Sequence, residues 1–245
     1  MTDKTINHLP RHSTPKFHRI LKTLAWLGVK IVARVDVQGL ANIPASGPFV
    51  GVTNHLSSFD TLTLIALAPV MRGTAFGAVE HRSDFIAGWA LDRLGLIWVR
   101  RGEADRDAIK IALDELKSGT IVGVAIEGTR SRTGGLLPGK TGAVYLATRA
   151  NVPVLPMVVW GTEQVITNLK RLKRSVIHVR VGPVIHLPEG RAGTAQLEQY
   201  TDEIMLKMAQ MLPPEYRGCY ADLSKATETF LVFTPPSQSN LLMAI

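Results

Sequence analysis

Residues 120–126 have the sequence Thr-Ile-Val-Gly-Val-Ala-Ile, and the segment Glu127-Gly128-Thr129-Arg130 follows directly. A short apolar run of this kind is typical of a strand that is buried on both faces of a sheet. Residues 106–117 before it carry apolar side chains at helical spacing, and residues 142–150 after it are predicted to be another helix. A buried strand between two helices predicts an α/β fold.

The rest of the chain continues this alternation of strands and helices. Further strands are predicted at residues 35–37, 48–53, 74–79, 96–99, 154–160 and 176–181. Further helices are predicted at residues 60–68, 83–94 and 194–212. We find no internal repeat and no dividing linker, so we expect a single domain at residues 35–220, with a mixed sheet flanked by helices. Residues 221–245 carry little pattern, which predicts a weakly ordered C-terminal tail.

Residues 1–34 are predicted to be an N-terminal arm that ends in a basic amphipathic helix. Ser13-Thr14-Pro15 is a helix-start signal. One face of the helix carries mainly apolar residues: Phe17, Ile20, Leu21, Leu24, Gly28, Ile31 and Val32. The other carries Lys16, Arg19, Lys22, Lys30 and Arg34, with Trp26 among them. This arrangement is typical of a helix on a membrane surface, although a helix packed on its own domain has a similar pattern.

Composition and charge narrow the classes of function. Hydrophobic residues make up 46% of the 245 residues, which excludes a disordered chain. The net charge of +8 favours an anionic partner: nucleic acid, an acidic membrane leaflet, a phosphorylated substrate or an acidic carrier protein. Cys219 is the only cysteine, so no intrachain disulfide and no cysteine metal site can form. The chain shows neither a signal peptide nor a run of about eighteen apolar residues, so work on lipid would take place at the bilayer surface.

The first candidate for chemistry is Asn54-His55-Leu56-Ser57-Ser58-Phe59-Asp60, where a predicted buried strand gives way to a helix. A turn between His55 and Asp60 would let the carboxylate hold the imidazole in one tautomer and stabilise its protonated form. Such a histidine is a competent general base for a hydroxyl near neutral pH. One such spacing also arises readily by accident, so the motif alone is a weak signal.

Two further groups of charged residues follow predicted strands. Glu127 and Arg130 come directly after the strand at 120–126, where α/β sheets usually bind their ligands. Arg130 offers a planar fork of donors that suits phosphate oxygens, and Gly128 lets a ligand approach the backbone. Arg100-Arg101 ends the strand at 96–99 and could bind phosphate or simply be solvated.

These segments, together with Val152-Pro153-Val154-Leu155-Pro156, resemble the 1-acylglycerol-3-phosphate O-acyltransferase family, the glycerophospholipid acyltransferases. That family has an N-H-x-x-x-x-D block, then a strand that ends in arginine, then F-P-E-G-T-R and V-P-x-x-P blocks. The matches here, in the same order, are Asn54–Asp60, Gly95–Arg101, Glu127–Arg130 and Val152–Pro156. Two positions depart from the pattern, because Ala125-Ile126 replaces Phe-Pro and Arg100 stands where an acidic or polar residue is common.

The resemblance implies an enzyme in which His55 deprotonates an acceptor hydroxyl and Asp60 orients His55. Arg101 and Arg130 would bind the acceptor's phosphate, with Glu127, Gly128 and Thr129 shaping that pocket. The expected reaction moves a fatty acyl group from acyl-CoA or an acyl carrier protein to 1-acylglycerol-3-phosphate and gives phosphatidic acid. Glycerol-3-phosphate or another lysophospholipid is an alternative acceptor. We expect no cofactor and no metal, no nucleic acid partner, and a peripheral location on the cytoplasmic face of the cell membrane.

Two functions outside this family stay open on the residues alone. Residues 134–141, Gly-Gly-Leu-Leu-Pro-Gly-Lys-Thr, satisfy the nucleotide-binding pattern G-x-x-x-x-G-K-[ST]. A working P-loop needs a strand that ends at its first glycine, whereas residues 127–133 intervene here. A basic module without catalysis is the other alternative, since Lys170, Arg171, Lys173 and Arg174 form a predicted basic loop. For that loop a phospholipid headgroup or an acidic carrier is the favoured partner.

Overall fold

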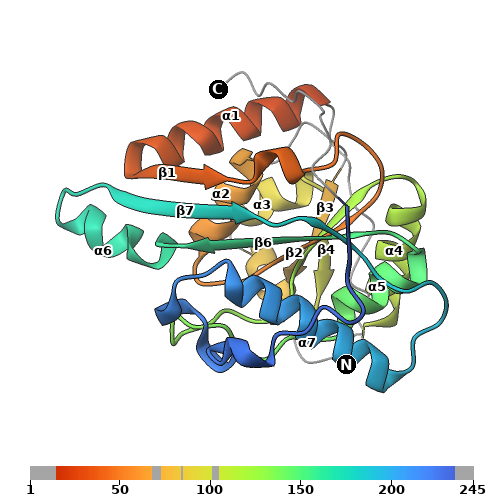
Figure 1. The fold of residues 1–245 in the computed structure, drawn as a ribbon. Coiled ribbons are helices and arrows are strands. Elements are labelled where there is room, and N and C mark those ends of the chain that lie inside the picture. The colour runs from red at the N-terminus through yellow and green to blue at the C-terminus, as the bar shows by residue number, and fades with distance from the viewer. Residues whose placement is uncertain (1–14, 68–72, 84, 101–104, 235–245) are drawn as a thin grey trace, which may run out of the picture.

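A mixed β-sheet runs through the computed structural model of the chain, which describes residues 15–67, 73–83, 85–100 and 105–234 (Figure 1). The strands are β1 (Ala33–Gln38), β2 (Val50–Thr53), β3 (Gly73–Ala78), β4 (Ile97–Val99), β5 (Ile121–Ala125), β6 (Val154–Trp160), β7 (Ser175–Val181), β8 (Val184–His186) and β9 (Val232–Thr234). The helices are α1 (Pro15–Val32), α2 (Ser58–Leu67), α3 (Phe85–Arg93), α4 (Arg106–Lys117), α5 (Gly142–Ala150), α6 (Val165–Lys170) and α7 (Thr194–Gln210).

The strand order brings the ends of β2, β5 and β6 together. The main order is β1-β7-β6-β2-β5-β3-β4, and β8 and β9 extend from β6. β2 is parallel to both of its neighbours, β5 and β6, whereas β7 is antiparallel to β6. The carboxyl ends of β2, β5 and β6 therefore lie at one edge of the sheet. The prediction of an α/β fold with a mixed sheet and flanking helices is confirmed.

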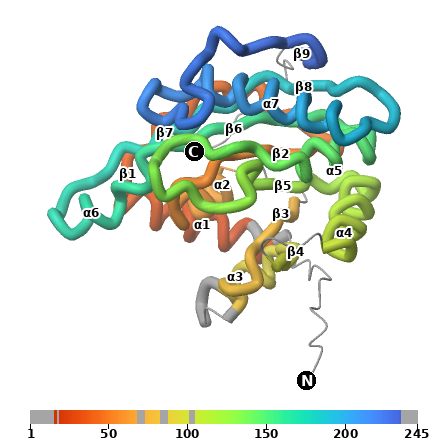
Figure 2. The backbone as a smooth tube through the Cα atoms, turned by 90° about the horizontal axis from the view of Figure 1, so that it is seen from below, coloured from red at the N-terminus to blue at the C-terminus, as the bar shows by residue number. Residues whose placement is uncertain are grey.

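Helices cover both faces of the sheet, and neighbouring residues of β6 point to opposite faces. Val158 is buried in a core that includes residues of α4, α5 and α7. Val159 is buried in a second core with residues of α1, β7 and α6. Figure 2 shows α1, α2 and α3 on one side of the sheet and α7 on the other. Burial on both faces explains why the central strands are continuously apolar.

Helix α1 packs on the domain by one side and leaves an apolar stripe exposed on the other. Val29 is buried against the sheet, and α1 also contacts α2. At 100° per residue, Ile20 lies opposite Val29 on the helix. The exposed stripe comprises Ile20 (58% exposed), Leu24 (59%), Leu27 (52%) and Ile31 (72%). The stripe differs from the predicted apolar face, because Leu27 joins it while Phe17, Leu21 and Val32 are half-buried. No helix within the described ranges has the length and apolar content to cross a bilayer.

Part of the expected weakly ordered tail, 221–245, packs on the domain. Glu203 of α7 accepts hydrogen bonds at Oε1 from the Thr227 hydroxyl (2.7 Å) and the Thr229 amide (3.0 Å). Its Oε2 accepts one from the Phe230 amide (3.0 Å). The chain then adds β9 to β8 in antiparallel pairing. Residues 221–234 are thus held by a buried carboxylate and a strand, and residues 235–245 lie outside the described residues.

We predict that Glu203→Ala lowers the free energy of unfolding by about 2 kcal/mol, because two backbone amides lose their acceptor. Urea denaturation would measure this loss, and limited proteolysis should show faster cleavage in residues 227–234. Glu198→Ala, at an exposed position of the same helix, is the matched control and should leave both measurements unchanged. Equal stability of the two variants would show that Glu203 does not hold this segment.

Candidate active site

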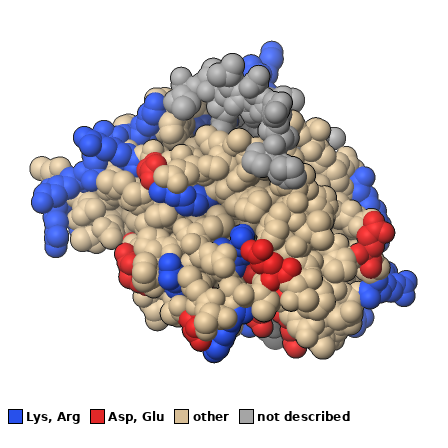
Figure 3. Space-filling view, viewed as in Figure 1, with Lys and Arg blue, Asp and Glu red and all other residues tan. Residues whose placement is uncertain are grey.

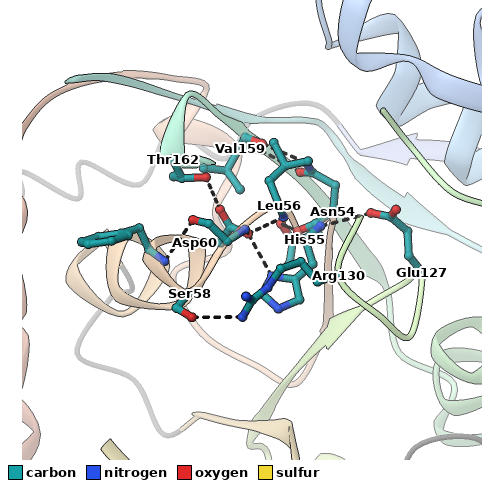
Figure 4. Close-up of polar contacts among 12 residues, drawn as sticks. Asn54, His55, Leu56, Ser58, Asp60, Glu127, Arg130, Val159 and Thr162 are labelled. Carbon is teal, nitrogen blue, oxygen red and sulfur yellow. Dashed lines mark hydrogen bonds and ion pairs between the residues drawn. The ribbon is translucent and has the colours of Figure 1, made fainter. Parts of the chain in front are cut away.

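Asn54 fixes the point at which the chain leaves β2. Its side chain is buried, and its Nδ2 donates to the Val159 carbonyl (2.8 Å) while its Oδ1 accepts from the Val159 amide (2.8 Å). The backbone pairing of β2 with β6 ends at Thr53 and Met157. Just beyond it, the Asn54 side chain makes the two hydrogen bonds to β6 that a backbone neighbour would make. His55 follows directly, so its position is set by both central strands (Figure 4).

The Asp60 carboxylate gathers four donors around the turn that holds His55. His55 Nδ1 lies 2.8 Å from Asp60 Oδ2. The same oxygen accepts from the amides of Leu56 (2.6 Å) and Ser57 (2.8 Å). The other oxygen, Oδ1, accepts from the hydroxyl of Thr162, which follows β6. Asp60 also lies in the first turn of α2, where the helix dipole favours a negative charge.

This network leaves one nitrogen of the His55 ring available for proton transfer. The carboxylate can only accept hydrogen bonds, so the Nδ1 of a neutral ring carries the proton and Nε2 carries the lone pair. The Asp60 side chain is 2% exposed and the His55 side chain 19% exposed. A buried carboxylate that holds a partly exposed imidazole is the arrangement of a general base with its orienting partner.

Glu127 ties the His55 turn to the loop between β5 and α5. Its Oε1 accepts from the His55 amide (3.1 Å), and its Oε2 accepts from the Leu137 amide (2.8 Å). Burial raises the pKa of Glu127 from 4.5 to about 7, against the opposing effect of these two amides. Glu127 therefore positions backbone on both sides of the site and does not point a free carboxylate outward.

Arg130 crosses the same turn from the β5 side. Its Nη2 donates to the Ser58 hydroxyl (3.0 Å), and the amide of Ser131 donates to the His55 carbonyl (2.8 Å). The Nε of Arg130 is buried and has no hydrogen-bond partner among the residues that the structure describes. Figure 4 shows the guanidinium near the His55 ring. The structure therefore bonds a cationic guanidinium to the same turn that carries the imidazole.

Gly128, Thr129 and Lys140 complete the surface beside Arg130. Gly128 has a φ of +68°, a left-handed conformation that favours glycine. Gly128 and Thr129 are exposed, and the aliphatic stem of Lys140 lies against Gly128, 3.3 Å from where a Cβ would stand. Within the described ranges the ammonium of exposed Lys140 makes no ion pair. Two cationic side chains thus flank the Gly128 turn.

The second arginine predicted to bind phosphate is not placed. Arg101 lies outside the described residues. Arg100 lies just past the carboxyl end of β4, and both β3 and β5 separate that strand from β2. The ends of β2 and β5 therefore lie side by side, while the Arg100 end is farther along the same edge.

Sequence reasoning assigned no role to Thr162, and it gave Asn54 no function beyond its place in a motif. Thr162 lies two residues past the end of β6, so the rule that directed attention to Glu127 after β5 could have found it. The bond from Asn54 to Val159 joins residues far apart in the chain, and no local pattern signals it.

The loop at 134–141 does not form a phosphate cradle. Four of its amides already donate within the protein. Leu136 N donates to the Tyr216 carbonyl, and Leu137 N donates to Glu127 Oε2. Gly139 N donates to the Tyr220 hydroxyl, and Lys140 N donates to the Ile126 carbonyl. A P-loop binds phosphate with such amides, so this network opposes the nucleotide-binding alternative. No group of three or more His, Cys, Asp or Glu residues in the described part of the chain is placed to hold a metal ion.

We predict that Glu127→Gln changes how stability depends on pH. Between pH 4.5 and about 7 the native protein binds more protons at Glu127 than the unfolded chain does, so this carboxyl makes the protein less stable as pH rises. Relative to Glu127→Gln, the wild type should lose up to about 3 kcal/mol of unfolding free energy across that range. Urea denaturation at several pH values would measure the difference, with exposed Glu189→Gln as the control. Parallel curves for the wild type and Glu127→Gln would contradict the raised pKa.

Comparison with known proteins points to one family. A family model described as Acyltransferase matches residues 34–160, more than half of the chain. The chain is 34% identical over 158 residues to the chloroplastic 1-acyl-sn-glycerol-3-phosphate acyltransferase BAT2 of Brassica napus. That alignment covers 61% of this chain and 44% of the relative. The chain is also 37% identical over 128 residues to 1-acyl-sn-glycerol-3-phosphate acyltransferase alpha of Homo sapiens, in an alignment that covers 51% of this chain and 45% of the relative.

The fold also has a solved counterpart. The crystal structure of the 1-acyl-sn-glycerophosphate (LPA) acyltransferase PlsC from Thermotoga maritima superposes with a TM-score of 0.62 at 24% identity, covering 80% of this chain and 79% of that one. The chain spans about half the length of the curated relatives it matches. Since the family match covers more than half of the sequence and includes His55, Asp60, Glu127 and Arg130, the chain belongs to the acyltransferase family.

Proposed function

We propose that this protein transfers a fatty acyl group from an acyl thioester to the free hydroxyl of 1-acylglycerol-3-phosphate, which gives phosphatidic acid. The observation that supports this most directly is the imidazole of His55, held by buried Asp60 in a turn to which Arg130 also bonds through Ser58. The relatives from Brassica napus and Homo sapiens carry the name of this activity. Acyl-CoA and acyl carrier protein are the two donors that we consider.

In the proposed mechanism, His55 Nε2 removes the proton of the acceptor hydroxyl. The oxygen attacks the thioester carbonyl, and a tetrahedral intermediate forms with a negative oxygen. Collapse of this intermediate restores the carbonyl of the new ester and breaks the carbon–sulfur bond. The leaving sulfur takes the proton from the imidazolium, so the protein is unchanged after each turnover. Asp60 stabilises the imidazolium while it exists, and no acyl-enzyme is required.

The cationic side chains beside the Gly128 turn would hold the acceptor's phosphate. Arg130 offers the planar donors of its guanidinium, and exposed Lys140, whose stem lies against Gly128, offers an ammonium. We include Arg101 as a further phosphate ligand on the strength of its motif, together with Thr129 as a wall of the pocket. A charged group bound by several donors fixes the hydroxyl near His55, which lowers the entropic part of the barrier.

The proposed substrate is a lipid, so the protein must meet a membrane surface. The apolar stripe of α1 points away from the domain, and exposed Lys16, Arg19 and Lys30 lie on the same helix. An exposed aliphatic stripe with basic flanks suits shallow insertion among anionic headgroups. We propose that α1 seats the domain on the cytoplasmic face of the cell membrane as a peripheral protein.

We predict that His55→Ala lowers kcat by about a thousandfold or more, because it removes the general base and leaves Asp60 without an imidazole to orient. Transfer of labelled acyl-CoA to 1-acylglycerol-3-phosphate would measure the loss. His178→Ala is the matched control, because His178 also pairs with an aspartate, Asp36 at 3.0 Å, but takes no part in the hydrogen bonds around Asp60. Retained turnover in His55→Ala would exclude it as the base.

We predict that Arg130→Ala and Lys140→Ala each lower selectivity for a phosphate-bearing acceptor by about ten- to a hundredfold, the usual effect of losing a charge-assisted hydrogen bond. Selectivity is the ratio of kcat/KM for 1-acylglycerol-3-phosphate to that for 1-acylglycerol, which lacks the phosphate. Arg149→Ala, on an exposed face of α5, should leave the ratio unchanged. An unchanged ratio in either test variant would remove that residue from the phosphate site.

A further inference from the structure

The turn between α6 and β7 carries a dense group of cationic and apolar side chains. Residues 170–174 are Lys-Arg-Leu-Lys-Arg, and no acidic residue occurs between Glu163 and Glu189. Leu172 at the tip is 96% exposed. Three apolar neighbours are also exposed: Ile166 (51%), Leu169 (46%) and Val176 (49%). We call residues 166–176 the basic turn.

The tip of the basic turn is held in a conformation that leucine rarely adopts. Leu172 has a φ of +54°, in the left-handed region that costs a residue with a Cβ about 1 kcal/mol or more. The amides of Arg171 and Lys173 both donate to the Asn168 carbonyl (2.9 Å each), and Asn168 Nδ2 donates to the Ser175 hydroxyl (3.0 Å). This framework projects the Leu172 side chain into solvent. Leu172 thus holds the left-handed position that ends helix α6, where glycine is usual, and its exposed leucine side chain adds little to the stability of the fold.

The basic turn is joined to the exposed helix α1. Arg174 Nη2 donates to the carbonyls of Lys30 and Ala33, at the junction of α1 and β1. Figures 1 and 2 both show the α6–β7 connection beside this end of α1. Figure 3 shows Lys and Arg side chains gathered on the same end of the molecule. The basic turn therefore extends a surface on which α1 already exposes aliphatic side chains.

We propose that the basic turn is a second membrane contact, in which Leu172 inserts among lipid chains while Lys170, Arg171 and Lys173 bind anionic headgroups. This inference rests on the proposed membrane-surface function. Two separate contacts, α1 and the basic turn, fix the tilt of the domain on the bilayer, whereas one helix alone leaves it free to rotate about the helix axis. Lipid is the occupant that fits, because four cations surround an apolar tip and the surface continues into the stripe of α1.

Vesicle sedimentation tests this proposal without measuring catalysis. Vesicles of phosphatidylcholine with phosphatidylglycerol would be compared with vesicles of phosphatidylcholine alone, using the full chain. Leu172→Asn should weaken binding to the anionic vesicles by about tenfold, because an inserted apolar side chain is lost. Asparagine adopts the left-handed region readily, as Asn151 does in this chain at a φ of 52°, so the melting temperature should stay equal or rise.

A charge-matched pair of variants separates local binding from net charge. Lys170→Ala with Lys173→Ala should weaken binding by about tenfold or more at low salt, and less at high salt. Lys110→Ala with Lys117→Ala removes the same charge from α4, which Figure 2 shows at the other end of the sheet, and should have a much smaller effect.

Three outcomes would overturn the proposal. The first is wild-type vesicle binding by Leu172→Asn and by the Lys170/Lys173 double variant, even if substitutions in the α1 stripe abolish binding. The second is a fall in melting temperature of Leu172→Asn, which would assign Leu172 a structural role. The third is slower acyl transfer from acyl carrier protein by these variants while their vesicle binding is unchanged, which would make the basic turn a binding site for the carrier protein. A wild-type protein that binds vesicles normally but transfers no acyl group would instead count against the proposed function.

Discussion

The hydrogen bonds to the Asp60 carboxylate are the interaction on which the site depends. A carboxylate with only 2% of its side chain exposed is costly to bury unless its oxygens are satisfied. Here one oxygen accepts from His55 Nδ1 and two backbone amides, and the other accepts from Thr162. The same bonds that make the burial tolerable also prevent the imidazole from rotating. The hydrogen bonds to Asp60 are therefore needed both for the stability of the fold and for the orientation of His55.

The sheet supplies the donors from separate parts of the chain. β2 leads into the His55 turn, β5 leads into Glu127 and Arg130, and β6 leads into Thr162. Because β2 is parallel to both β5 and β6, these three exits share one edge. Asn54 then bonds the first exit to β6, and Glu127 bonds it to the loop after β5. The catalytic turn is thus fixed from both sides before any substrate is present, which is the condition for preorganised catalysis.

Prediction from the sequence succeeded where a signal was long and local. The bounds of α4, α5 and β6 agree with the structure, since periodicity and apolar runs define them. Short elements were missed: α6 has six residues, and β8 and β9 have three each, too few for a pattern. Lys170, the first residue of the basic loop expected at 170–174, is therefore the last residue of helix α6. Tertiary bonds were also invisible, so the packing of residues 221–234 on Glu203 and the bond from Thr162 to Asp60 appeared only in the structure.

The measurement that tests the central claim most directly is the turnover of an Asp60→Asn variant that is shown by its melting curve to be folded. The amide cannot satisfy the same donors, so it should leave His55 in the wrong tautomer or orientation. We expect kcat for transfer to 1-acylglycerol-3-phosphate to fall by about a thousandfold or more, with KM for both substrates little changed. Turnover within tenfold of the wild type would contradict the claim that a buried carboxylate makes His55 the base.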